Sequence, residues 1–357
     1  MKILIIKTSS LGDIIQAIPS LFLLKKEFPD ATIDWMVEKP FIELLEAHPL
    51  INQAIPIETK RWKKSFLSPK TWKAVFRTIR ILRQVSYDLV FDLQGNTKSG
   101  LMTFFAKGKE KIGYNFKAAP EWPNALFLTH RYPTEKSQPI AEQYLHIIEK
   151  HFSIAHSTID PFFQLRITKE EESWIDEKCV KLTKMPIMVC LGSNWENKKI
   201  SLPTGKVFLQ AVEKKADPYF FFVWGSEKEK EEAEALHSLF PKCSEVLPKM
   251  RLPVWQRLIS KMGGVISVDS SALHLTATTR TPSFSLFGPS SSKVFKPQGK
   301  HHLAIQGQCP YGTFFEKRCP CLRTCSTGSC LKDVSTADLI SSFCDWHNEL
   351  LAEVCLI

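Results

Sequence analysis

An acidic side chain stands close behind the first apolar run of the sequence. The stretch KTSSLGD places Asp13 three residues after Ser10 and directly after Gly12, where a strand is expected to lead into a helix. Backbone amides at a helix start can hold an anion or a sugar, so Ser10 and Gly12 are candidates for contact with such a ligand. Asp13 is either a cap that satisfies these amides or a general base that takes a proton from an acceptor hydroxyl.

A second acidic residue stands at another expected strand–helix junction. In VDSSALH, Asp269 precedes Ser270 and Ser271, and His274 lies one helical turn after Ser270. A lone aspartate at a helix start is usually a cap. An aspartate cap that is accompanied by a histidine, and is followed later by FGPSS, is also consistent with a diphosphate-binding site.

Two further strand ends carry groups that suit a nucleotide. GSNWENKK contains Ser193, Lys198 and Lys199, and a lysine beside an anion site can neutralise a departing phosphate. WGSEKEKEE offers the Trp224 ring and the Glu229 carboxylate to a base and a ribose, or simply a core tryptophan and a solvated acidic helix. The Walker and GxGxxG signatures are absent from the sequence, which disfavours an NTPase and a dehydrogenase.

The charge and the cysteines indicate further partners. The formal net charge is +10, and nine basic residues but no acidic one lie between Lys60 and Arg83, interleaved with aromatic side chains. This pattern suits phosphates of an amphipathic ligand, an anionic membrane or nucleic acid. Five of the ten cysteines fall in one segment, at spacings that leave a structural zinc site open without forming paired CxxC knuckles. They are Cys309, Cys319, Cys321, Cys325 and Cys330.

Short apolar runs alternate with amphipathic helical patterns, and this rhythm restarts after Pro186. The alternation predicts an α/β protein with parallel sheets covered by helices, and 357 residues suit two domains with a linker within residues 155–185. No run reaches the ~18 apolar residues of a membrane span, and Ile3–Ile6 is too short for a signal peptide. An intracellular protein, soluble or lodged on a membrane surface, is therefore expected.

Five of these stretches resemble, in order, the landmarks of glycosyltransferase family 9, the ADP-heptose:lipopolysaccharide heptosyltransferases. They are KILIIKTSSLGDIIQAIPSL, YDLVFDLQGNTKSG, GSNWENKK, VISVDSSALHLTA and SLFGPSS. The segment IETKRWKKSF, followed by DLQG and LPKM, is most similar to the heptosyltransferase I branch, which adds the first heptose to Kdo-lipid A.

The resemblance implies a GT-B fold, in which two Rossmann-like domains face each other across a cleft. The implied domains are an acceptor-binding domain (1–170), a nucleotide-sugar-binding domain (171–334) and a C-terminal helix (335–357) that packs back on the first domain. It also implies inverting transfer from ADP-heptose to Kdo-lipid A, with no cofactor and no catalytic metal. The implied location is cytoplasmic, peripheral on the anionic inner face of the inner membrane, without a nucleic-acid partner.

Residue roles follow from the same resemblance. Asp13 corresponds to the catalytic base, Lys198 to the donor-side lysine and Glu229 to the ribose-binding glutamate. The diphosphate cradle falls on Asp269, Ser270, Ser271 and His274, and the acceptor site on Lys60, Arg61, Lys63 and Lys64 together with Gln94 and Asn96. Ser271 stands where the family usually has glycine, and Ile200–Pro203 stand where Trp-Pro often follows the lysine, which makes Lys199 an alternative to Lys198.

Two alternatives remain open from the sequence. The chain could be a heptosyltransferase II or III, or use another nucleotide sugar. A non-catalytic protein that binds nucleic acid through residues 60–83 is the alternative from another class, and it leaves the five strand-end motifs unexplained.

Overall fold

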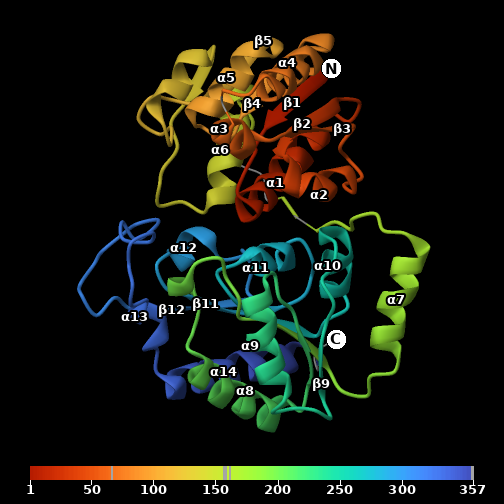
Figure 1. The fold of residues 1–357 in the computed structure, drawn as a ribbon, viewed down its shortest axis with the longest axis vertical. Coiled ribbons are helices and arrows are strands. Elements are labelled where there is room, and N and C mark those ends of the chain that lie inside the picture. Colours follow the sequence, from red (N-terminus) through yellow and green to blue (C-terminus); the bar gives the residue numbers. More distant parts are fainter. Residues whose placement is uncertain (66, 156–158, 161, 355–357) are drawn as a thin grey trace. The chain divides into compact units, whose positions relative to one another are not determined.

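The computed structural model describes residues 1–65, 67–155, 159–160 and 162–354. The chain divides into two compact units, Met1–Pro161 and Phe162–Ile357. Each unit contains one six-stranded parallel sheet with helices packed around it (Figure 1). This arrangement confirms the predicted α/β architecture with two parallel sheets.

The sheet of the first unit has the strand order β3-β2-β1-β4-β5-β6. Its strands are β1 (Lys2–Ile6), β2 (Thr32–Glu38), β3 (Gln53–Ile57), β4 (Ser86–Asp92), β5 (Lys107–Tyr114) and β6 (His130–Tyr132). Its helices are α1 (Leu11–Glu27), α2 (Ile42–Glu46), α3 (Thr59–Lys64), α4 (Pro69–Gln84), α5 (Thr97–Phe105) and α6 (Ile140–Phe152), with short 3-10 helices η1 (Lys39–Phe41) and η2 (Trp122–Phe127).

The sheet of the second unit has the order β12-β11-β10-β7-β8-β9. Its strands are β7 (Pro186–Cys190), β8 (Tyr219–Phe222), β9 (Ser244–Val246), β10 (Gly264–Val268), β11 (Ser283–Phe287) and β12 (His302–Gln306). Its helices are α7 (Lys169–Val180), α8 (Leu202–Ala216), α9 (Glu227–His237), α10 (Leu252–Ile259), α11 (Ser271–Thr276), α12 (Ser292–Phe295), α13 (Ser329–Lys332) and α14 (Thr336–Val354), with the 3-10 helix η3 (Glu196–Lys198).

The two sheets share one topology, and it determines where ligands bind. Ile3–Ile6 of β1 and Gly264–Val268 of β10 are fully or almost fully buried, since each is a central strand with covered faces. The strand order reverses between β1 and β4 in the first unit, and between β7 and β10 in the second. In open α/β sheets the crevice for a ligand lies at such a reversal, beyond the carboxyl ends of the strands.

The division between the units falls nearer the N-terminus than the predicted boundary at 170/171. Residues just after 161 are bonded to the second unit: Phe163 N donates to Thr278 O at 3.2 Å, and Leu165 N to Gln256 Oε1 at 3.3 Å. These hydrogen bonds fix the start of the second unit.

Helix α14 packs within the second unit. Phe343 and Trp346 lie against Phe284 of β11, with ring centroids 5.6 and 5.8 Å apart. Helix α14 also contacts α8. The predicted return of this helix to the first domain concerns the placement of one unit relative to the other and stays a prediction.

None of the described helices combines the length and the apolar character that a bilayer crossing requires.

Candidate functional site

The loop between β1 and α1 places the Asp13 carboxylate at the helix start. Ser10 is the N-cap of α1, and its N and Oγ donate to Asp13 Oδ2 at 3.2 and 2.7 Å. Gly12 lies in the first turn, and both Gly12 and Asp13 are half-buried. Asp13 therefore has a capping role, as the N3 residue of a capping box whose N-cap is Ser10. It is compatible with catalysis, because the same hydrogen bonds hold the carboxylate in one orientation.

Gln94 fastens this turn to the neighbouring strand end. Its Oε1 accepts hydrogen bonds from Thr8 N at 2.9 Å, Thr8 Oγ1 at 3.1 Å and Ser9 N at 3.0 Å. Gln94 thus positions the backbone that leads to Asp13. Asn96 is the N-cap of α5, and its Oδ1 accepts from Ser99 N at 2.9 Å. Direct contact of Gln94 or Asn96 with an acceptor stays a prediction.

Asp92, which the sequence analysis did not select as a site residue, organises the loop that carries Gln94. Its Oδ1 accepts from Gln94 N and Gly95 N, both at 3.0 Å, and its Oδ2 from Thr103 Oγ1 at 3.0 Å and Asn124 Nδ2 at 2.7 Å. Burial raises the pKa of this carboxyl, and the hydrogen bonds only partly offset the effect. Its position as the last residue of a buried strand was the available signal.

The predicted acceptor segment forms α3. Lys60, Arg61 and Lys64 are exposed, and Arg61 Nη1 lies 3.6 Å from Glu58 Oε1. Lys63 belongs to α3, and its side chain lies outside the described part of the chain. The arrangement leaves several cationic groups in solvent.

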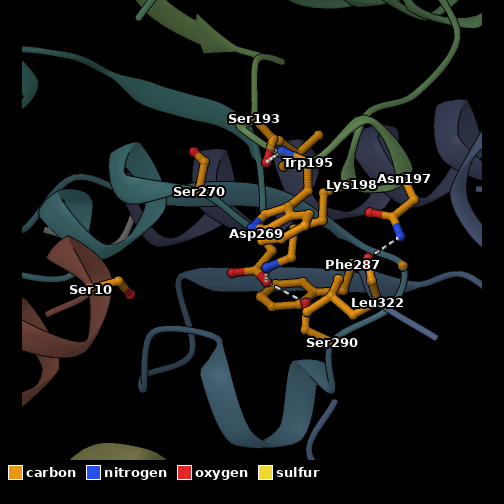
Figure 2. Close-up of polar contacts among 12 residues, drawn as sticks. Ser10, Ser193, Trp195, Asn197, Lys198, Asp269, Ser270, Phe287, Ser290 and Leu322 are labelled. Carbon is orange, nitrogen blue, oxygen red and sulfur yellow. Dashed lines mark hydrogen bonds and ion pairs between the residues drawn. The ribbon is translucent and has the colours of Figure 1, made fainter. Parts of the chain in front are cut away.

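In the second unit, three side chains meet at the buried carboxylate of Asp269, and Figure 2 shows two of them, Lys198 and Ser290. Lys198 Nζ lies 2.5 Å from Asp269 Oδ2, which also accepts a hydrogen bond from Ser290 Oγ. His274 Nε2 lies 3.5 Å from Asp269 Oδ1. Asp269, Lys198 and His274 keep only 7%, 12% and 8% of their side-chain surface exposed.

The partners of Asp269 determine its charge. Burial alone would raise the pKa of this carboxyl, but the His274 hydrogen bond and the Lys198 charge outweigh burial and hold it well below the usual range. Asp269 is therefore an anion that Lys198 compensates. Ser270 is the N-cap of α11, its Oγ lies 3.1 Å from Ser267 Oγ, and Ser271 begins the helix.

Lys199 lies apart from this cluster. Its Nζ is 3.2 Å from Glu196 Oε1 and 3.5 Å from Glu232 Oε2, and its side chain is 7% exposed. It lines a cavity of about 180 Å³ together with Gly192 and Glu229. The structure thus groups Lys198, and not Lys199, with Asp269 and His274.

Glu229 and Trp224 are held by local contacts. Glu229 Oε2 accepts from Gly225 N at 2.8 Å and Ser226 N at 3.0 Å, which closes the turn before α9. Trp224 Nε1 donates to Leu247 O at 2.8 Å. Ser193 Oγ accepts from Trp195 N at 3.3 Å in the turn after β7. Their contacts with a nucleotide stay predictions.

The cysteine loop, residues 309–330, supports the Lys198 segment. Leu322 O accepts a hydrogen bond from Asn197 Nδ2 at 2.8 Å (Figure 2). Cys319 N donates to Pro289 O at 2.8 Å, and Arg318 pairs in a β-bridge with Ser290. The loop therefore touches the residue before Lys198 and the hydroxyl residue bonded to Asp269.

The thiols of this loop are free. Burial raises the pKa of Cys330 to about 11, and the charges of Cys309, Cys325 and Cys319 raise it further. Across the described residues, no three cysteine sulfurs lie within 4.8 Å of one another. The zinc site proposed from their spacing, including Cys321, stays a prediction.

Comparisons with known proteins place these features in a family. Residues 75–323 match the model of glycosyltransferase family 9 (heptosyltransferase). Lipopolysaccharide heptosyltransferase 1 of Salmonella typhimurium is 28% identical over 85% of this chain and 93% of its own length. That of Pseudomonas aeruginosa is 26% identical over 89% and 87%.

A solved structure extends this similarity to the fold. The structure of E. coli heptosyltransferase WaaC with ADP matches with a TM-score of 0.73 and 25% identity, covering 85% of this chain and 93% of that one. WaaC has also been solved with ADP-2-deoxy-2-fluoro heptose. These neighbours have the GT-B fold, which confirms the predicted fold class.

We expect Gly95→Ala to destabilise the first unit. Gly95 has φ +72°, and an added Cβ would lie 2.5 Å from Pro120 Cδ and 2.9 Å from Tyr114 Cδ2. Left-handed strain alone costs about 1–2 kcal/mol, and the crowding adds to it. Gly312→Ala is the matched control, because Gly312 has φ +69° with no neighbouring atom within 4 Å. Urea unfolding should show the larger loss for Gly95→Ala; equal losses would contradict the crowding.

We expect Lys198→Met to lower the free energy of unfolding by about 3–5 kcal/mol, because it leaves the buried Asp269 carboxylate uncompensated. Adding Asp269→Asn should restore part of the loss. Lys228→Met is the control, since Lys228 pairs with Glu196 at an exposed position and should matter little. Thermal and urea denaturation of ligand-free protein measure the effect. Equal stability of Lys198→Met and Lys228→Met would show that the buried pair contributes nothing.

Proposed function

Because the chain belongs to glycosyltransferase family 9, we propose that it is an inverting heptosyltransferase acting in lipopolysaccharide inner-core synthesis. It transfers heptose from ADP-L-glycero-D-manno-heptose to a hydroxyl of the Kdo sugar in Kdo-lipid A. The observation that carries this proposal is the similarity to heptosyltransferases 1 over 85–89% of the chain.

In the proposed reaction the acceptor hydroxyl attacks the anomeric carbon of the heptose. A new carbon–oxygen bond forms as the bond from that carbon to the ADP phosphate breaks, and the single displacement inverts the centre. Asp13 takes the hydroxyl proton as general base. Ser10 supports this role, because its two hydrogen bonds to Oδ2 orient the carboxylate before the substrate arrives.

The second unit is proposed to hold the donor. Lys198 and the start of α11, with Ser270, Ser271 and His274, bind the diphosphate, and Lys198 stabilises the charge of departing ADP. Asp269 contributes by placing the lysine, since the two side-chain atoms lie 2.5 Å apart. Glu229 is proposed to bind the ribose and Trp224 the base.

The acceptor side is proposed to include the cations of α3. Lys60, Arg61, Lys63 and Lys64 would meet the phosphates of the lipid A portion, with Gln94 positioning the catalytic turn. The first heptose transfer is favoured over the steps of heptosyltransferases II and III, because the identity to heptosyltransferases 1 is 28% and 26%, against 23% and 25% to heptosyltransferases 3 and 20% to heptosyltransferase II of E. coli.

We also propose that α3 and α4 contact the anionic cytoplasmic face of the inner membrane. Trp72 and Phe76 are 41% and 63% exposed, and Leu67 between the helices is 93% exposed. The exposed cations Lys70, Lys73 and Arg77 lie on the same helix as the two aromatic rings. Basic side chains near such a surface contribute about 1 kcal/mol each, and the apolar side chains add insertion into the interface.

Replacing Asp13 by asparagine should reduce turnover by about 10²–10⁴-fold, because the shape is kept and the proton acceptor is lost. ADP binding, measured by calorimetry, should persist, since the proposed donor site lies in the second unit. The assay is mass spectrometry of Kdo-lipid A incubated with ADP-heptose and the protein. Near-normal turnover of Asp13→Asn would overturn the role of Asp13, and no product from the wild type would overturn the proposed acceptor or donor.

Binding to anionic vesicles should weaken when Trp72 and Phe76 are both changed to serine, and weaken further when Lys70 and Lys73 become glutamine. Cosedimentation with phosphatidylglycerol vesicles measures the binding, and neutral phosphatidylcholine vesicles are the control. High salt should release the protein, because it screens the charges. Equal binding of wild type and variants would exclude α4 as the membrane contact.

A further inference from the structure

A cluster of two histidines and one glutamate lies in the first unit, away from the residues assigned above. Glu110 Oε2 in β5 is 3.5 Å from His130 Nδ1 in β6 and 3.5 Å from His151 Nε2 in α6. One ligand atom from each of the three residues lies within 4.8 Å of the others. The proposed transfer reaction uses none of these residues.

The cluster opens onto a cavity of about 820 Å³ at the edge of the sheet where β1 and β4 begin, opposite the edge that carries the catalytic turn. The cavity is lined by Met1, which precedes β1, by Asp88 near the start of β4, and by Tyr132. Met1 and Asp88 are near the amino ends of β1 and β4, whereas Asp13 and Gln94 follow the carboxyl ends. The cluster is therefore distinct from the candidate catalytic site.

The ligand set fits a divalent transition metal ion. Two imidazoles and a carboxylate are ligands that Zn²⁺ and its neighbours share, often with a water in the remaining position. Metal–ligand bonds of about 2.0–2.2 Å place neighbouring ligand atoms in a tetrahedral site about 3.3–3.5 Å apart. The 3.5 Å separations from Glu110 Oε2 to the two ring nitrogens match this spacing.

The surroundings hold the His151 ring in place. His151 keeps 7% of its side-chain surface exposed, and Tyr132 OH lies 3.3 Å from its Nδ1, which leaves Nε2 facing Glu110. Such a contact to the second ring nitrogen is typical of metal-binding histidines.

We propose that Glu110, His130 and His151 bind a divalent transition metal ion of the Zn²⁺ class. The ion would join β5, the three-residue edge strand β6 and the end of α6. Strand β6 is so short that it forms few hydrogen bonds with its neighbouring strand. A metal ligand from its first residue would attach it to the rest of the unit. The role of the site is to stabilise the first unit.

The experiment uses full-length protein freed of metal with EDTA, and a background variant, Cys319→Ser with Cys325→Ser, that removes two of the five thiols of the cysteine loop. Zn²⁺ is titrated by calorimetry, and Co²⁺ is added as a spectroscopic probe. We expect binding at one site, a Co²⁺ spectrum without thiolate charge-transfer bands, and a rise in melting temperature with Zn²⁺. His130→Ala is the principal variant, because the His130 side chain is 44% exposed and its loss should not prevent folding.

In this background, His130→Ala and Glu110→Gln should each weaken Zn²⁺ binding at least tenfold and abolish the rise in melting temperature. His237→Ala is the control: it removes an unrelated histidine on α9 of the second unit and should leave binding unchanged. Gln143→Ala would not serve, because Gln143 is buried. Undiminished binding in both site variants, or no binding in the background protein, would overturn the proposal and identify the cluster as an ion pair only. No readout depends on transfer activity, so failure here leaves the proposed function intact.

Discussion

The donor-side arrangement depends on one buried negative charge. Asp269 ends a fully covered strand and has almost no access to water, so its ionised form persists only with partners. Lys198, Ser290 and His274 supply them from three different segments of the second unit. Because each partner is bound to the same carboxylate, the segments that carry them are held in register, and the lysine has one defined position rather than the many that a surface side chain samples.

The first unit has a corresponding buried aspartate, but its hydrogen-bond partners are different. Asp92 ends β4 beside the reversal of strand order, but its described partners are backbone amides, a hydroxyl and an amide, without a cation. Its carboxyl therefore keeps a raised pKa, in contrast to Asp269. Asp92 shapes the loop, the loop carries Gln94, and Gln94 holds the turn before Asp13. A chain of three contacts thus links Asp13, the proposed catalytic group, to the wholly buried Asp92.

The sequence predicted the elements whose burial is continuous. Strands β1, β2, β4, β7, β10 and β11 have apolar runs because both of their faces are covered. Strand β5 was not predicted because its first half, KGKE, is polar and only its last three residues are buried. Strand β9 has three residues, and β12 is an edge strand without a buried residue. The pairing of Lys198 with Asp269 joins residues 71 positions apart, so no local pattern could reveal it. Likewise, Glu110, His130 and His151 come from three elements and share no motif.

The contacts of the cysteine loop limit how chimeras of related chains can be built. Its backbone meets the second unit at Asn197, Pro289 and Ser290, so the loop acts as an outer wall for the segments that present the lysine and the serine. A chimera that imports this loop from a relative must import the side chain at position 197 with it. Otherwise the carbonyl of residue 322 loses its donor, and the 3-10 turn that ends at the lysine loses an anchor. Loop and turn form one exchangeable module, although 125 positions separate their contact in the chain.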